Sequence, residues 1–131
     1  MTSSVLDVLI IEDEPILAKN ICAYLVRYGY GVRLAATAEA GLSELEAFKP
    51  DVIVLDFNLP GMNGLEALSK IRAIDCQIKV LMMTACDSAE LAVKAMRAGA
   101  SDFVTKPISV AKLKLKLEGI VIDARRDQGW S

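Results

Sequence analysis

Histidine is absent from all 131 residues of this chain. Its absence excludes histidine-based catalytic triads, histidine metal ligands and a phosphohistidine on the chain itself. The three cysteines, Cys22, Cys76 and Cys86, lie far apart and form no Cys-x-x-Cys pair. Neither a disulfide framework nor a zinc site is therefore indicated, and a reducing cytoplasm is the compartment we expect.

Long apolar runs and a surplus of positive charge are also missing. No stretch approaches the roughly 18 apolar residues of a membrane span, and residues 1–4 lack the basic start of a secretory signal. Fifteen lysines and arginines face 17 acidic residues, for a net charge of -2. We therefore expect a soluble, unexported protein with no membrane partner and no direct binding of nucleic acid by this chain.

Apolar residues make up 53% of the chain but aromatic residues only 5%, which predicts an aliphatic core. The hydrophobic periodicity alternates between strands and helices along the whole sequence. We predict strands at 5–11, 30–35, 52–55, 79–84 and 102–105, and helices at 14–28, 38–48, 65–74, 88–98 and 109–124. Such strict alternation is typical of a single α/β domain with a doubly wound parallel sheet covered on both faces.

The domain is predicted to occupy residues 5–124. Residues 1–4 are expected to form a disordered N-terminus, and residues 125–131 a polar tail or the start of a linker. The sequence leaves open whether the chain acts alone or belongs to a longer regulator.

Five chemically active side chains stand at predicted carboxyl ends of strands, where ligands bind in open parallel sheets. They are Glu12, Asp13, Asp56, Thr84 and Lys106. Three carboxylates so close together repel one another unless a cation lies between them. Mg²⁺ fits this set because it takes few carboxylates and completes its shell with water and phosphate oxygens, and Mn²⁺ is an acceptable substitute.

The same residues suggest a division of labour for phosphoryl transfer. Lys106 offers a compact positive charge for a phosphoryl oxygen, and Thr84 a hydroxyl for another. Asp56 remains as the nucleophile that would form an aspartyl phosphate. Since the chain has no histidine, a phosphohistidine donor would be another molecule.

Four segments around these residues are similar to the response-regulator receiver domains of two-component signal transduction, the family that includes chemotaxis regulators. They are Ile11-Glu12-Asp13-Glu14, Leu55-Asp56-Phe57-Asn58-Leu59-Pro60-Gly61-Met62-Asn63-Gly64, Thr84-Ala85, and Phe103-Val104-Thr105-Lys106-Pro107. The resemblance covers nearly the whole chain. It implies a flavodoxin-like fold with five helices and a five-stranded parallel sheet in the order 2-1-3-4-5.

The resemblance also implies a role for each site residue. Asp13 and Asp56 would bind the metal directly, Glu12 mainly through water, and Asn58 through its backbone carbonyl. Thr84 and Ala85 would contact the phosphoryl group together with Lys106. Phe103 would turn inward as Thr84 shifts, and the Lys106–Pro107 bond would be cis.

By the same resemblance, the chain is a phosphorylation-dependent signalling switch rather than an enzyme. A sensor histidine kinase or a histidine phosphotransfer protein would donate the phosphoryl group to Asp56, and slow autodephosphorylation would remove it. The change would reach the last two strand–helix units and control a partner or an output domain.

The last predicted helix carries a second signal. At about 100° per residue, one face gathers a core stripe made of Val110, Leu113, Leu117, Ile120, Val121 and Ala124. Ala111, Leu115 and Ile122 fall on the opposite side as an apolar patch rimmed by lysines. A monomer has little reason to expose such a patch. We therefore expect this face to support a phosphorylation-dependent homodimer or the docking of a partner.

Three alternatives remain at this point. A flavin carrier of the same architecture needs a hydroxyl- and glycine-rich phosphate loop after the first strand, where this chain has Glu12-Asp13-Glu14. An aspartate-based phosphatase generally carries a second acid two residues after its nucleophile, where this chain has Asn58. A degenerate receiver that only mediates interactions would not need all five site residues.

Overall fold

The computed structural model describes residues 6–85 and 89–127, and within the last helix the side chains up to residue 120 and that of Ile122. Strands and helices alternate along the chain. The elements are β1 (Asp7–Ile11), α1 (Pro15–Arg27), β2 (Gly31–Ala35), α2 (Ala38–Ala47), β3 (Val52–Asp56), α3 (Gly64–Ile74), β4 (Lys79–Thr84), α4 (Ala89–Arg97), β5 (Asp102–Thr105) and α5 (Val110–Asp127).

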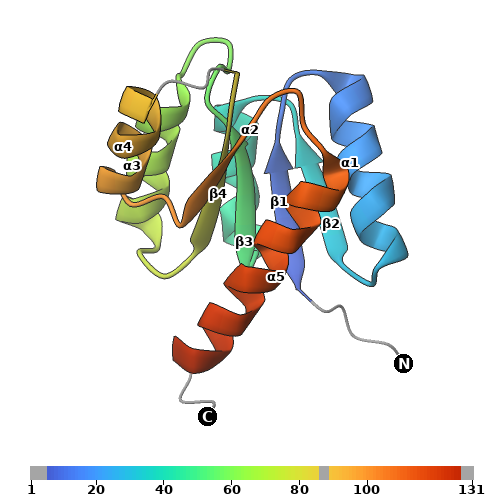
Figure 1. The fold of residues 1–131 in the computed structure, drawn as a ribbon. Coiled ribbons are helices and arrows are strands. Elements are labelled where there is room, and N and C mark those ends of the chain that lie inside the picture. The colour runs from blue at the N-terminus through green and yellow to red at the C-terminus, as the bar shows by residue number, and fades with distance from the viewer. Residues whose placement is uncertain (1–5, 86–88, 128–131) are drawn as a thin grey trace.

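All four strand pairings are parallel, and the sheet has the predicted order β2-β1-β3-β4-β5. Helices α1 and α5 cover one face, and α2, α3 and α4 cover the other, so that the domain has three layers (Figure 1). The predicted doubly wound α/β fold is therefore confirmed. Because every strand runs in the same direction, all five carboxyl ends lie along one edge of the sheet.

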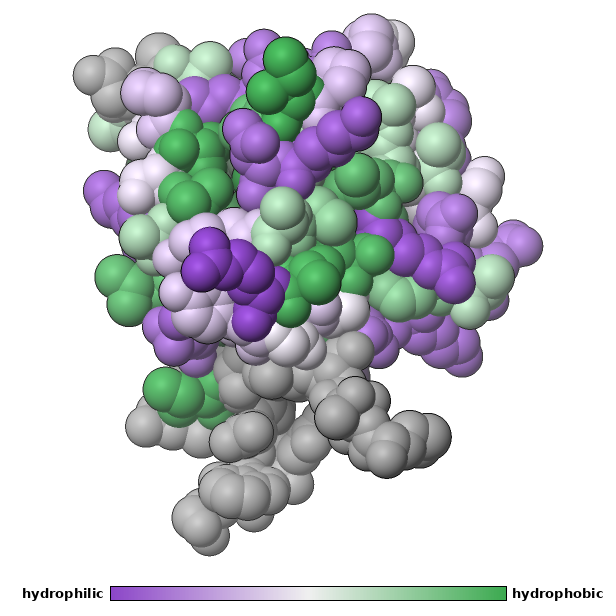
Figure 2. Space-filling view, turned by 90° about the vertical axis from the view of Figure 1, so that its right-hand side faces the viewer, coloured by the Kyte–Doolittle hydropathy of each residue, from purple (hydrophilic) through white to green (hydrophobic). Residues whose placement is uncertain are grey.

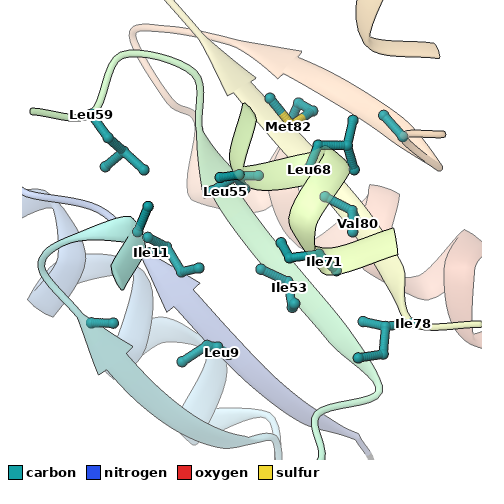
Figure 3. Close-up of a cluster of buried hydrophobic side chains, with 14 of the residues drawn as sticks. Leu9, Ile11, Ile53, Leu55, Leu59, Leu68, Ile71, Ile78, Val80 and Met82 are labelled. Carbon is teal, nitrogen blue, oxygen red and sulfur yellow. The ribbon is translucent and has the colours of Figure 1, made fainter. Parts of the chain in front are cut away.

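Strand β3 is the centre of the core. It pairs with β1 on one side and β4 on the other, and all five of its residues are buried. Ile53 and Leu55 point to the α2–α4 side, where they meet Leu68 and Ile71 of α3 (Figure 3). Val54 points to the α1–α5 side. Each fully buried aliphatic side chain of this kind contributes roughly 1.5–3 kcal/mol of transfer free energy, which fixes the strand that ends in Asp56.

Two glycines end helices where the sequence predicted stops. Gly29 follows α1 with φ 92° and Gly99 follows α4 with φ 108°. This left-handed backbone conformation is costly for a residue with a Cβ atom, so glycine is the natural residue at both ends.

Helix α1 buries only part of its apolar residues. Ile21 and Leu25 are fully buried, but Ile16 is 77% exposed and Tyr28 47% exposed. Ile16 lies five residues before Ile21, about 140° around the helix, and so faces solvent instead of the core. On the α1 side of the molecule, apolar groups appear between hydrophilic side chains (Figure 2).

The ends of the domain differ slightly from the prediction. Strand β1 begins at Asp7 instead of residue 5, and α5 runs from Val110 through Asp127 instead of ending at residue 124. Arg125 and Arg126 are good helix formers, which favours this extension. Residues 1–4, which we expect to be disordered, and residues 128–131 of the tail lie outside the described residues. The side chains of Val121 and Ala124 lie outside them as well. The domain bounds 5–124 remain a prediction.

Leu113, Leu117 and Ile120 form the buried stripe of α5, as predicted. No helix in the described part of the chain is long and apolar enough to span a membrane.

Candidate functional site

The carboxyl edge of the sheet brings together side chains from the ends of β1, β3 and β5. Glu12 and Asp13 directly follow β1, Asp56 is the last residue of β3, and Lys106 follows β5. Strand order reverses between β1 and β3, so Glu12 and Asp56 stand on neighbouring strands at the switch point of the sheet. This is the position at which open α/β sheets bind their ligands.

Three carboxylates form the acidic part of the site. One oxygen each from Glu12, Asp13 and Asp56 lie within 4.8 Å of one another. Glu12 is only 2% exposed and Asp56 only 1%, whereas Asp13 faces solvent. Burial raises the pKa of Glu12 above its ordinary value, and the charge of Asp56 adds to that increase, although the backbone N–H of Glu14 and the ammonium of Lys106 oppose it. Two like charges in this space are unfavourable without a cation.

Lys106 supplies a positive charge between two of these carboxylates. Its Nζ lies 3.0 Å from Glu12 Oε1 and 3.2 Å from Asp56 Oδ2, and its side chain is 20% exposed. Burial lowers the pKa of Lys106, but the close contact with Glu12 and the charges of the two carboxylates outweigh it, so the pKa lies above its ordinary value. The lysine is therefore held as a cation beside Asp56.

The donor set also suits a divalent metal ion. Glu12 Oε2 accepts a hydrogen bond from the N–H of Glu14, at 3.0 Å. Glu12 Oε1 is buried and, among the described residues, has no hydrogen bond of good geometry, despite its ion pair with Lys106. A buried oxygen in this state can accept a metal ion or a metal-bound water. Carboxylate oxygens are the ligands that hard cations prefer, so this acidic cluster could bind a metal.

The loop after β3 orients the carboxylate of Asp56. The N–H of Asn58 donates to Asp56 Oδ1 at 3.2 Å, while Oδ2 faces Lys106. The loop is closed by a backbone hydrogen bond of 2.7 Å from Gly64 to Phe57. Asn63 then caps α3 by accepting from the N–H of Glu66 at 2.9 Å. Asp56 is thus held in one orientation with one oxygen directed at a cation.

The remaining predicted site residues lie at the ends of the last two strands. Thr84 ends β4 and is 2% exposed, and Ala85 follows it at the surface. Phe103 lies in β5, half-buried against the α2–α4 cluster. The Lys106–Pro107 peptide bond is cis. Cys86 lies outside the described residues.

The three predicted interface residues of α5 are exposed. Leu115 is 68% exposed and Ile122 54% exposed, and Ala111 also faces solvent.

The direct contact between Glu12 and Lys106 does not follow from the sequence. The spacing predicted that Glu12 and Lys106 would share one edge, but Glu12 was assigned only to the metal and Lys106 only to a phosphoryl oxygen. Their direct ion pair depends on side-chain length and on the depth of each loop.

Comparison with known proteins identifies the class. The family model of the response regulator receiver domain matches residues 8–118, and the chain belongs to this family. The probable transcriptional regulatory protein TcrX of Mycobacterium tuberculosis is 35% identical over 114 residues, which cover 87% of this chain and 49% of that protein. A cyclic di-GMP phosphodiesterase of Thermotoga maritima is 37% identical over 110 residues, or 84% of this chain and 29% of that protein.

Solved structures agree with this assignment. A CheY-like response regulator receiver domain from Methanospirillum hungatei has a TM-score of 0.88 at 28% identity, with 97% of this chain and 99% of that chain covered. The chain is therefore a receiver domain of two-component response regulators, with the flavodoxin-like fold predicted from its motifs. It spans about half or less of the length of the curated relatives described above.

Proposed function

We propose that this domain is a phosphorylation-dependent switch in which Asp56 accepts a phosphoryl group from a sensor histidine kinase or a histidine phosphotransfer protein. The observation that carries the proposal is the environment of Asp56. It is a buried carboxylate at the switch point of the sheet, between two further carboxylates and the ammonium of Lys106. A stable fold gains little from three carboxylates in contact, whereas phosphoryl transfer with a cation needs them.

Each residue has a task in this transfer. An oxygen of Asp56 attacks phosphorus, the bond from phosphorus to the donor's imidazole nitrogen breaks, and the imidazole leaves with the electron pair. Lys106 lies 3.2 Å from Asp56 and is placed to stabilise the negative charge of a phosphoryl oxygen. Attack by water on the aspartyl phosphate later returns inorganic phosphate and the free carboxylate of Asp56.

Mg²⁺ is the metal we propose for the acidic cluster, with Mn²⁺ as a substitute. Asp13 and Asp56 would hold it directly, Glu12 through water, and Asn58 through its backbone carbonyl. When bound, the ion offsets the negative charge that gathers on the phosphoryl oxygens during transfer. The close approach of the three carboxylates of Glu12, Asp13 and Asp56 supports this assignment.

Thr84, Ala85 and Phe103 would carry the signal away from the site. The Thr84 hydroxyl and the N–H of Ala85 are proposed to bind phosphoryl oxygens after transfer. Thr84 would shift toward them, and Phe103, which is already half-buried, would turn further inward. The strand–helix units β4–α4 and β5–α5 would then present a different surface to a partner or an output domain.

The metal and the phosphoryl group are tested together by intact mass spectrometry. We expect the protein to gain one phosphoryl group when it is incubated with acetyl phosphate and Mg²⁺, and to gain none when a chelator is present. The physical reason is that, without the metal, Lys106 offsets only part of the charge of the three carboxylates, so that they repel an anionic donor. No adduct under either condition, together with no binding of beryllofluoride, would contradict the proposal and favour a receiver that acts only by interaction.

The exposed apolar side of α5 is proposed as the surface for a homodimer or a docked partner. We expect Leu115→Lys to weaken association of the phosphorylated protein at least tenfold, because a charge would replace a 68% exposed apolar side chain at the centre of the patch. Ile16→Lys is the matched control, since Ile16 is equally apolar, 77% exposed and on α1. Sedimentation and partner titration measure the effect. If Leu115→Lys associated as the wild type does in both assays, the exposed side of α5 would not be the association surface.

We also propose the cytoplasm as the location, which the spacing of the cysteines supports. The longer relatives named above include a transcriptional regulatory protein and a phosphodiesterase, so control of transcription and control of an enzyme are the two kinds of output that they suggest.

A further inference from the structure

Arg72, near the carboxyl end of α3, joins three parts of the chain at the end of the sheet opposite Asp56. Its Nε and Nη2 donate to the carbonyl oxygen of Gly99, at 3.0 and 2.6 Å. Its Nη1 donates to the carbonyl oxygen of Ile78, immediately before β4. The guanidinium is held partly out of water, and this burial lowers its pKa. The backbone carbonyls of Gly99 and Ile78 stabilise its charge.

The contact between Arg72 and Gly99 is close, and a larger residue at position 99 would displace the side chain of Arg72. A Cβ atom on Gly99 would lie 2.9 Å from Arg72 Nε and 3.3 Å from its Cδ, and the φ of 108° disfavours any other residue as well. Gly99 forms the turn that ends α4, where its N–H donates to Met96 at 3.1 Å and Ala100 donates to Ala95 at 3.0 Å. Arg72 therefore binds the turn that fixes the end of α4.

Few side chains of α4 are deeply buried. The structure describes all of α4, and Ala95 is the only fully buried side chain in it. Val93 is 46% exposed and Met96 is 44% exposed. With so little apolar area buried, the position of the helix depends on what its two ends are attached to. The amino end of α4 follows Thr84, and its carboxyl end is bound by Arg72.

We infer that Arg72 is a positioning residue that anchors the carboxyl end of α4, so that α4 moves from its amino end when the switch responds. The movement itself rests on the proposed function, whereas the anchoring does not. Arg72 makes a two-pronged contact with Gly99 and reaches Ile78 at the same time. A lysine keeps the charge and most of the stem but lacks the planar fork, so it cannot hold both carbonyls in this way.

Amide hydrogen exchange of the metal-free protein tests the anchor. We expect Arg72→Lys to accelerate exchange at Gly99 and Ala100 at least tenfold, while Leu81 in the sheet exchanges as in the wild type. Lys70→Met, an exposed substitution on the same helix, is the matched control and should leave all three amides unchanged. Unchanged exchange at Gly99 and Ala100 in Arg72→Lys would overturn the anchor, whether or not the protein can be phosphorylated.

Beryllofluoride, which mimics the phosphoryl group, tests the direction of movement. In the wild type and in Lys70→Met, amide NMR shifts on binding should decrease along α4 from Ala89 to Arg97, and the Nε–H signal of Arg72 should stay unchanged. In Arg72→Lys the shifts should extend to Arg97, an effect that a loss of stability alone would not produce. A large shift of the Arg72 Nε–H signal in the wild type would show a released anchor and contradict the inference, even if Arg72→Lys failed to fold. Failure of beryllofluoride to bind would contradict the proposed function, and the exchange experiment would still decide the anchor.

Discussion

Asp56→Asn is expected to abolish phosphoryl acceptance from both acetyl phosphate and a phosphohistidine donor. The asparagine keeps the size and the buried position of the side chain. However, its amide has no carboxylate charge to attack phosphorus and to form an acyl phosphate. We expect a loss to the detection limit, below about one hundredth of the wild-type rate, which corresponds to more than roughly 2.7 kcal/mol of lost transition-state stabilisation.

Asp51→Asn provides the control for this prediction. Asp51 directly precedes β3, is exposed, and therefore lies at the opposite end of the strand that Asp56 terminates. The phosphorylation rate of the Asp51→Asn variant should equal that of the wild type when the incorporated phosphoryl group is followed by intact mass. Wild-type incorporation in Asp56→Asn would mean that another residue is the acceptor.

Gly64→Ala is expected to lower the free energy of unfolding by about 1–3 kcal/mol, the usual range for an overpacked core site. A Cβ atom at Gly64 would lie 2.6 Å from the Cα of Phe57 and 3.0 Å from the carbonyl oxygen of Asp56. Both atoms belong to the backbone behind the proposed acceptor and cannot turn aside as a flexible side chain would. The loop must shift, so phosphorylation should also slow.

Gly119→Ala is the matched control, because nothing lies within 4 Å of a Cβ atom added to Gly119 on α5. There the substitution should stabilise the protein by about 0.5–1 kcal/mol, since alanine favours a helix interior. Urea unfolding of the two variants measures both effects. Equal stability of the two variants would show that the close approach at Gly64 has no energetic consequence.

The fold could be predicted from the sequence because its signals are local and repeated. Continuous aliphatic runs such as 52–55 mark strands buried on both faces, and Gly29 and Gly99 mark the ends of helices. The convergence of Glu12, Asp56 and Lys106 followed from parallel strands alone, which place all carboxyl ends on one edge. The strand order came from the resemblance to receiver domains, and the structure confirms it.

What the sequence did not show depends on exact side-chain geometry. Ile16 has a residue type that suggests burial, but its angular position on α1 places it in solvent. The pairing of Glu12 with Lys106 requires the reach of both side chains. Arg72 lies inside the predicted helix 65–74, and only the folded chain brings it to the carbonyls of Ile78 and Gly99.

The most direct test of the central claim is to locate the phosphoryl group chemically. Borohydride reduces an acyl phosphate on aspartate to homoserine, so the phosphorylated protein can be reduced, digested and sequenced by mass spectrometry. We expect homoserine at position 56 and nowhere else, and none in a sample treated with chelator before the donor is added. Homoserine at Asp13 or at another residue, or a phosphate that survives reduction on a hydroxyl group, would contradict Asp56 as the acceptor.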